Sequence, residues 1–300
     1  MLITVIITAY NRREFILYAV NSVLNQTLKD NYELIVIKNY HDKIIDSFLE
    51  ENKIKHIYSE EKTLGGKLSE AIKSSSGEII AFLEDDDAFM KCKLEYLFSL
   101  FKKHKNLIYY HNCYIPVNEK RSITVYDKHS PDFNMSCITI SKEIINIGKI
   151  PRVNDLLDTF MYLSALESGK LIMVNRKKLT YYMVHQSASN IFATNLIEFT
   201  QARIKYLNNL ILTLNQFNNF FKGRRSKNYL KSQIGYYELH RFIYTKQYIP
   251  KNLINFLIYS KIGFMNRIKY TFIYMLLRLF RNKYRNYIEN RIYKKWIRKI

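Results

Sequence analysis

The sequence has few of the residues that build disulfide-rich or irregular folds. Of its 300 residues, three are Cys, four are Pro and eight are Gly. The cysteines, Cys92, Cys113 and Cys137, form no CxxC pair, which argues against a disulfide framework or a zinc site and fits a reducing cytosol. So little Pro and Gly excludes collagen-like and proline-rich chains. With 48% hydrophobic and 24% charged residues, the composition is globular and excludes a disordered chain.

Long apolar runs are also missing. The longest charge-free apolar runs in the last third, 252–260 and 270–277, are far short of the ~20 residues that a membrane-spanning helix needs. Met1 is followed directly by a strand-like run, without a basic segment or a small-residue cleavage site, so no signal peptide is expected. These features predict a cytoplasmic protein.

Acidic residues are almost absent from the last third. Residues 201–300 hold 22 Lys and Arg, and their only acids are Glu238 and Glu289, whereas residues 1–200 hold 25 basic and 24 acidic residues. The net charge of +21 therefore lies almost wholly in this segment. Such a cationic segment predicts an anionic partner: nucleic acid, acidic lipid or a phosphorylated substrate.

The first 110 residues alternate between β-branched runs and segments of helical periodicity. Strands are expected at 2–8, 32–37, 54–58, 78–83 and 107–111, and helices at 42–51, 64–75 and 91–103. A capping box of Asn11 and Glu14 predicts another helix that runs to about Asn25. Strands that alternate with helices through short loops predict an α/β fold with a mostly parallel, Rossmann-like sheet.

The rest of the chain changes character twice. Short strands are expected at 122–126, 137–140, 171–174 and 179–184, with a helix at 155–167. From about residue 195 the pattern is helical. We therefore predict an α/β domain at 1–192 and an all-helical, strongly basic extension at 193–300.

Polar residues follow four of the predicted strands, and ligands of parallel sheets bind at the carboxyl ends of strands. The segments are Thr8 to Asn11, Lys38 and Asn39, Gly65 to Lys67, and Glu84 to Asp87. Consecutive aspartates repel one another, and a divalent cation relieves that repulsion because hard cations prefer carboxylate oxygens. The segments predict a Mg²⁺ or Mn²⁺ site. The alternative is a solvated acidic loop that caps the next helix.

Four segments resemble motifs of family 2 glycosyltransferases, which have the GT-A fold. ITVIITAYNRREFILYAVNSVLNQT (3–27) resembles the opening signature of the family, and GEIIAFLEDDDAF (77–89) its DXD segment. LDTFMYLSALESG (157–169) resembles its later ED-type helix, and YYMVHQS (181–187) its Y-x-x-H segment. The matches follow the family's order over about residues 1–190.

The resemblance implies a nucleotide-diphospho-sugar donor, a divalent cation and a glycan or lipid-linked acceptor. Asp158 matches the carboxylate that acts as general base in inverting members of the family. It would take a proton from the acceptor hydroxyl. The implied metal ligands are Asp86, Asp87 and His185. The implied donor-binding residues are Thr8, Ala9, Tyr10, Asn11, Asn39, Gly66, Lys67 and Asp85.

Three departures from the family pattern leave the donor open. The acidic segment usual after the second strand is replaced by Lys38 and Asn39, the ED pair by Leu157 and Asp158, and the AR pair by Lys67 and Leu68. Simpler roles are also open. Asn11 could only cap a helix, the Gly pair could serve only the turn, Lys67 could be solvated, and Asp158 and His185 could be structural.

Residues 264–285 predict a cationic amphipathic helix. Its apolar face holds Ile268, Phe272, Met275, Leu276 and Leu279; roughly opposite lie Arg267, Arg278, Arg281 and Arg285. Such a helix lies on an anionic membrane surface, with Tyr270, Tyr274 and Tyr284 at the interface. The alternatives are packing against the catalytic domain and, less favoured, binding of nucleic acid. Family members with lipid-linked acceptors favour the membrane, which predicts a peripheral protein on its inner face.

Two other functions are weaker. A nucleotidyltransferase would need a G-x-G-T-R-like phosphate loop after the first strand, and Thr8 to Arg12 lack those glycines. A nucleic-acid-binding protein that works through its basic segment would leave the neutral first 200 residues unexplained. We therefore predict a metal-dependent glycosyltransferase.

Overall fold

The computed structural model describes residues 1–120, 122–123, 134–184, 193–245, 250–259, 264–279 and 283–297. The chain divides into two compact units, Met1–His185 and Gln186–Ile300, whereas the sequence placed the boundary between residues 192 and 193.

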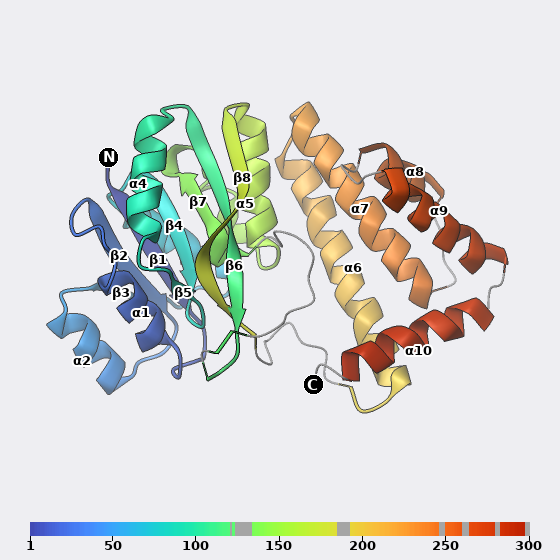
Figure 1. The fold of residues 1–300 in the computed structure, drawn as a ribbon, viewed down its shortest axis with the longest axis horizontal. Helices are drawn as coiled ribbons and strands as arrows, with labels where there is room; N and C mark the ends of the chain where they lie inside the picture. The colour runs from blue at the N-terminus through green and yellow to red at the C-terminus, as the bar shows by residue number, and fades with distance from the viewer. Residues whose placement is uncertain are drawn as a thin grey trace. The chain divides into compact units, whose positions relative to one another are not determined.

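The described residues of the first unit form an eight-stranded mixed sheet (Figure 1). The strands are β1 (Ile3–Ala9), β2 (Tyr32–Lys38), β3 (Lys55–Tyr58), β4 (Ile79–Glu84), β5 (Ala88–Phe89), β6 (Leu107–Val117), β7 (Ile138–Ser141) and β8 (Leu171–Met183). Their order is β3-β2-β1-β4-β7-β6-β8-β5. Strands β1 to β4 are parallel, as predicted, and β8 is parallel to β6. However, β7 is antiparallel to both β4 and β6, and β5 is antiparallel to β8.

Helices cover both faces of this sheet. The helices are α1 (Ile16–Leu24), α2 (Lys43–Glu51), α3 (Leu64–Lys73), α4 (Lys93–Lys103) and α5 (Leu157–Ser168), with short 3₁₀ turns η1 (Met135–Cys137), η2 (Lys142–Ile144) and η3 (Ile150–Arg152). Alternate residues of β1, namely Ile3, Val5 and Ile7, form one core cluster with α1, α2 and α4. Helix α3 contacts β1 and β2 outside that cluster, and α5 contacts β6 and β7.

Two strands, β6 and β8, are longer than expected. Strand β8 is continuous where two short strands were predicted, and it pairs with β6 from Leu107 to Val117. A polar run, 175–178, separates the two predicted strands in the sequence. The ladder accommodates this run by a register shift between His111 and Cys113, so alternation is lost without ending the strand. Of the strand predicted at 122–126, only residues 122–123 are described, and Ile123 forms an isolated bridge with Val117.

The second unit is helical in its described parts, as the sequence predicted. Its helices are α6 (Leu196–Phe220), α7 (Arg224–Tyr244), α8 (Pro250–Tyr259), α9 (Phe264–Leu279) and α10 (Lys283–Ile297). The helix expected at 264–285 is therefore divided between α9 and α10. A separate core joins them, in which the Tyr236 ring of α7 contacts Phe256 of α8 and Tyr270 of α9. Within the described ranges, no helix is both long and apolar enough to span a membrane.

Candidate active site

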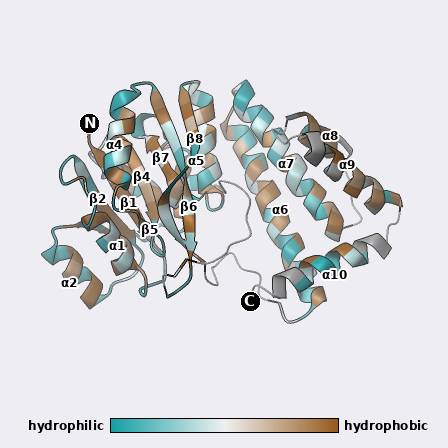
Figure 2. Ribbon diagram, viewed as in Figure 1, coloured by the Kyte–Doolittle hydropathy of each residue, from teal (hydrophilic) through white to brown (hydrophobic). Residues whose placement is uncertain are grey.

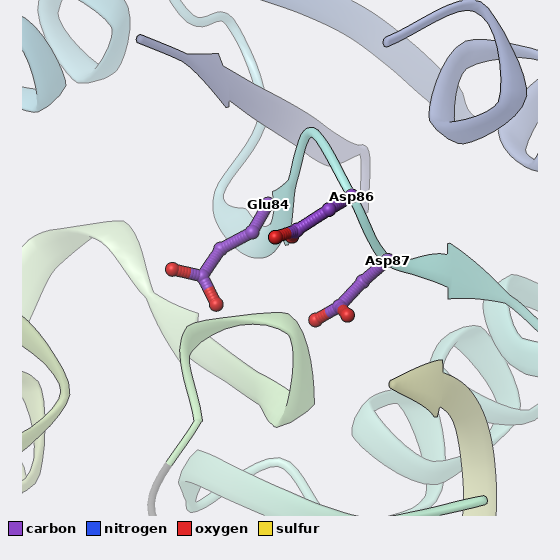
Figure 3. Close-up of side chains that lie close together, drawn as sticks. All are labelled: Glu84, Asp86 and Asp87. Carbon is purple, nitrogen blue, oxygen red and sulfur yellow. The ribbon is translucent and has the colours of Figure 1, made fainter. Parts of the chain in front are cut away.

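The acidic residues after β4 form a compact group, which we call the acid turn (Glu84–Asp87). Strand β4 ends at Glu84, and β5 begins at Ala88, so three aspartates occupy the connection. One carboxylate oxygen from each of Glu84, Asp86 and Asp87 lies within 4.8 Å of the others. Figure 3 shows these three side chains turned toward a common space. Because Thr8 pairs with Glu84, the acid turn lies at the carboxyl end of β1, where the sequence placed the ligand site.

The acid turn is largely closed to solvent, so it is not a solvated loop. Asp85 and Asp87 are 1% and 0% exposed. Asp87 Oδ1 accepts a hydrogen bond from the Met183 N–H at 2.9 Å, but Asp85 Oδ2 and Asp87 Oδ2 accept none from the residues that the structure describes. Burial, added to the charge of Asp86, raises the pKa of Asp87 to about 7. Burial also raises the pKa of Asp85 to about 6, and burial with the neighbouring carboxylates raises the pKa of Glu84.

Arg12 balances part of this charge and was not predicted as a residue of the site. Its Nη1 lies 2.6 Å from Asp86 Oδ2, and its Nη2 binds Asp85. The Tyr40 hydroxyl donates a 2.6 Å hydrogen bond to the Arg12 carbonyl and so fixes the chain after β1. The available signal was charge balance: Arg12 is a cation just beyond the strand that pairs with β4.

The acid turn fits a divalent cation. It offers hard carboxylate oxygens as ligands, and two of its buried oxygens accept no hydrogen bond from the described residues. A cation would also relieve the repulsion between the carboxylates. Of the predicted metal ligands, Asp86 and Asp87 lie together, and Glu84 joins them as a third carboxylate that was not predicted. His185 lies outside the described residues.

Asn11 and Asn39 bind each other across the ends of β1 and β2. The Asn11 N–H donates to Asn39 Oδ1 at 3.0 Å, and Asn39 Nδ2 donates to Asn11 Oδ1 at 2.8 Å. Asn11 has a left-handed backbone (φ 54°), which Asn tolerates, and it does not cap α1. The capping box predicted from Asn11 and Glu14 is therefore wrong, since α1 begins at Ile16 after Phe15.

Tyr10 and Lys67 lie side by side near this edge. Tyr10 is 49% exposed, whereas Ala9, just before it, is buried. Lys67 Nζ lies 4.9 Å from the centre of the Tyr10 ring and donates to the Glu61 carbonyl. Gly66 is constrained by the helix cap, because its N–H donates to Thr63 Oγ1 at 2.9 Å.

Lys38, the main departure from the family pattern, has a structural role. Its side chain is 1% exposed, and Nζ lies 2.7 Å from Asp46 Oδ1 and donates to the Tyr40 carbonyl at 2.8 Å. Burial alone would raise the pKa of Asp46, but the hydrogen bond and charge of Lys38 outweigh it and lower that pKa. Lys38 thus joins β2 to α2, and Asn39 is the polar residue at this end of β2.

Asp158 lies in the first turn of α5, close enough to the acid turn for its charge to raise the pKa of Glu84. Leu156, two residues before Asp158, has a left-handed backbone (φ 59°), which L residues with a side chain rarely adopt. The chain therefore turns sharply just before the helix that carries Asp158.

The start of α3 holds the segment that leads into α5. The Gly65 N–H donates to the Val153 carbonyl at 2.9 Å, and Thr63 Oγ1 donates to the Pro151 carbonyl at 2.7 Å. A Cβ at Gly65 would lie 2.0 Å from the Ile150 carbonyl oxygen, so only Gly permits this approach. The contact holds η3 and Val153, which precede α5, the helix that carries Asp158.

Lys93 supports the acid turn from the protein interior and was also not predicted. It is 0% exposed, and Nζ donates to the Ser136 carbonyl at 2.6 Å and to Thr180 Oγ1 at 3.0 Å. Ser136 Oγ in turn accepts the Glu84 N–H at 2.9 Å. Burial lowers the pKa of Lys93 to about 7, even though nearby Cys137 and Asp87 raise it. The buried Lys93 amine thus binds Ser136, whose hydroxyl in turn binds the backbone of the acid turn.

Comparison with known proteins agrees with this arrangement. Residues 4–161 match the sequence model described as Glycosyl transferase family 2. The chain belongs to this family. The predicted family is thereby confirmed, and the match includes the acid turn and Asp158.

Several relatives are named for their substrates or activity. The chain is 27% identical over 239 residues to UDP-Glc:alpha-D-GlcNAc-diphosphoundecaprenol beta-1,3-glucosyltransferase WfgD of Escherichia coli, covering 70% of this chain and 92% of that protein. It is 34% identical over 122 residues to an uncharacterized glycosyltransferase of Rickettsia bellii, covering 39% of this chain. The match spans only 17% of that Rickettsia protein and 20% of a similar one from Rickettsia conorii.

A solved structure with a similar fold is that of S. aureus TarS 1–349 in complex with UDP-GlcNAc. The TM-score is 0.55 at 14% identity, over 86% of this chain and 79% of that chain. The predicted GT-A fold with a helical C-terminal extension is confirmed.

Proposed function

We propose that this family 2 member is a metal-dependent, inverting glycosyltransferase that moves a sugar from a nucleotide-diphospho-sugar to an acceptor hydroxyl. The observation that carries the proposal is the acid turn, where three carboxylates converge and two buried oxygens have no donor among the described residues. This site lies at the carboxyl end of β1, inside the segment that matches the family.

The donor would lie along the carboxyl ends of β1, β2 and β4. Tyr10 offers an exposed aromatic face to a base, with the ammonium group of Lys67 on the ring and the backbone of Thr8 and Ala9 beside it. The Asn11–Asn39 pair keeps the strand ends together and offers amide groups to a base edge. Gly66 would serve this site by shaping the start of α3.

Asp86 and Asp87, with Glu84, would hold Mg²⁺ or Mn²⁺. When bound, the cation supplies positive charge that stabilises the departing nucleotide diphosphate. Asp85 would orient Arg12, which binds both Asp85 and Asp86. His185 stays a predicted metal or diphosphate ligand.

Asp158 would act as the general base. It would take the proton of the acceptor hydroxyl while that oxygen attacks the anomeric carbon from the side opposite the leaving group, so the configuration inverts. Its place beside the acid turn, on a helix anchored through Gly65 and Val153, supports this role.

The relatives support a lipid-linked saccharide as acceptor. WfgD and a second E. coli protein, WfaP, are both named for transfer of glucose from UDP-Glc to α-D-GlcNAc-diphosphoundecaprenol. We extend to this chain a UDP-sugar donor and a diphospholipid-linked saccharide, at the inner face of the cytoplasmic membrane. Nucleic acid is the weaker partner, because the family match lies outside the basic segment.

Thermal denaturation with UDP-, GDP- and dTDP-sugars, with and without Mn²⁺, tests the donor site. One nucleotide should raise the melting temperature only with Mn²⁺, because a ligand of the native state stabilises it by about 2.7 kcal/mol at 100 times its Kd. Asp86→Ala should abolish the rise, whereas Asp155→Ala, at an exposed position just before α5, should keep it. A rise that survives Asp86→Ala would refute the metal-dependent site.

Asp158→Asn tests the base separately. The donor-induced stabilisation should persist while kcat falls roughly 10²- to 10⁴-fold, the usual contribution of general base catalysis. Asp155→Asn is the matched control. Loss of donor binding with unchanged kcat would exclude the role of base.

A further inference from the structure

Helix α9 carries an apolar stripe whose side chains are exposed. The stripe consists of Ile268, Phe272, Met275 and Leu279, which are 48%, 56%, 47% and 73% exposed. Their spacing of four, three and four residues places them on one side of the helix. Figure 2 shows the apolar character of α9 in the second unit.

The opposite side of α9 is the side that packs. The Tyr270 ring lies 5.2 Å from that of Phe256 in α8, and the Tyr274 ring lies 5.8 Å from that of Phe242 in α7. Tyr270 and Tyr274 were predicted at a membrane interface, but they belong to the core of the second unit. Tyr284 has no described side chain. Helix α9 thus has two apolar faces, and the tyrosine face accounts for its packing.

We propose that the α9 stripe inserts into the surface of an anionic lipid bilayer. The charge of the surrounding chain selects this occupant. Residues 201–300 hold 22 Lys and Arg against two acids, and Arg278, beside the stripe, is exposed. A bilayer surface offers both an apolar layer for the four side chains and negative charge for the basic residues.

Other occupants satisfy only half of these features. A second copy of the chain would bring another strongly positive segment to the same face, so self-association through the stripe would be opposed by charge. A nucleic acid would match the charge but leave Phe272 and Leu279 in water. The membrane proposal is argued from residues of the second unit alone and does not depend on the proposed sugar transfer.

Vesicle flotation of the full-length chain tests the proposal. Vesicles of phosphatidylcholine and phosphatidylglycerol in equal parts should bind it, and pure phosphatidylcholine vesicles should bind at least tenfold less. The double variant Phe272→Gln/Leu279→Gln should bind the mixed vesicles at least tenfold less. Leu212→Gln is the matched control, because Leu212 is 66% exposed on α6, away from the stripe.

The melting temperature of each variant shows whether it is folded, and light scattering without vesicles gives the oligomeric state. Equal binding of the double variant and the wild type would overturn the proposal, because charge alone would then explain the interaction. If the wild type is a dimer and the double variant is a monomer, the proposal is also overturned, because the stripe would then serve self-association. Donor-induced stabilisation is measured independently, so this proposal and the proposed function can fail separately.

Discussion

Arg12 shows how the acid turn tolerates its charge. Four acidic residues in succession lie in a largely buried turn, and Arg12 reaches two of them from the neighbouring strand end. A bound cation and the Arg12 guanidinium would draw on the same Asp86 carboxylate. Arg12 therefore stabilises the protein without metal and would compete with the proposed cation.

Arg12→Ala should change two quantities in opposite directions. Without metal, the free energy of unfolding should fall by about 1–3 kcal/mol, because charged hydrogen bonds are lost. The rise in melting temperature on addition of Mn²⁺ should become larger, since the competing cation is gone. Arg13→Ala is the control, because Arg13 is more exposed and lies 3.6 Å from Asp42 instead. Identical behaviour of the two variants would contradict this role.

The raised pKa values of the aspartates predict how the proposed binding of a metal would depend on pH. The pKa of Asp85 is about 6 and that of Asp87 about 7, both mainly through burial. Between the pKa of an unfolded Asp, about 4, and these raised values, the native state holds more protons than the unfolded state. The stability that these two groups contribute to the metal-free protein is therefore complete below pH about 4 and is lost as the pH rises through 6 and 7. A cation needs the deprotonated forms, so its stabilising effect must grow over the same range.

The difference in melting temperature between Mn²⁺ and EDTA should therefore increase from pH 5 to pH 8. Taking this difference at each pH cancels titrations elsewhere in the chain. Asp87→Asn should flatten the profile, because its side chain cannot ionise. A difference that is largest at pH 5 would be incompatible with metal binding by these carboxylates.

Consecutive aspartates after a buried strand are visible in the sequence, so Asp86 and Asp87 could be predicted as a pair. Arg12 and Lys93 could not, because each reaches the site through tertiary contacts. Lys93 reads as an ordinary basic residue at the start of a helix, and only the fold places Ser136 and Thr180 around its amine.

At the scale of elements, the contact of α3 with η3 governs the position of Asp158. Gly65→Ala should lower the free energy of unfolding by about 1–3 kcal/mol, because the new Cβ would meet backbone oxygens that cannot move independently. It should also reduce kcat by displacing α5. Gly148→Ala offers a control, since its nearest atom would be 3.6 Å away. Calorimetry and kinetics measure both effects, and equal stability of the two variants would rule out a tight contact.

The buried parallel strands were predictable because β1, β2 and β4 are mainly apolar runs that are largely closed to solvent on both faces. Strand β8 was not predictable as one strand, since its middle is polar and exposed. The place of β7 was hidden for another reason: a four-residue strand carries no signal of the partners between which it lies. In α9, apolarity alone did not show which of two apolar faces packs.

At the scale of the whole molecule, the proposed donor site and the α9 stripe belong to units with separate cores. Hydrogen exchange should therefore report two independent patterns of protection. A nucleotide-sugar with Mn²⁺ should slow exchange at the acid turn and the end of β1, and anionic vesicles should slow it in α9. Each ligand alone is the control for the other. Protection of α9 by the nucleotide-sugar would show that the two units are coupled.

The strand pairing around the acid turn also has a consequence for biosynthesis. Asp87 accepts a hydrogen bond from the Met183 N–H, 96 residues later in the chain, and β5 pairs only with β8 among the described strands. A ribosome therefore exports the aspartates long before the segment that encloses them. Contacts so distant along the chain form late, so the nascent protein leaves its acidic turn open to water until β8 emerges.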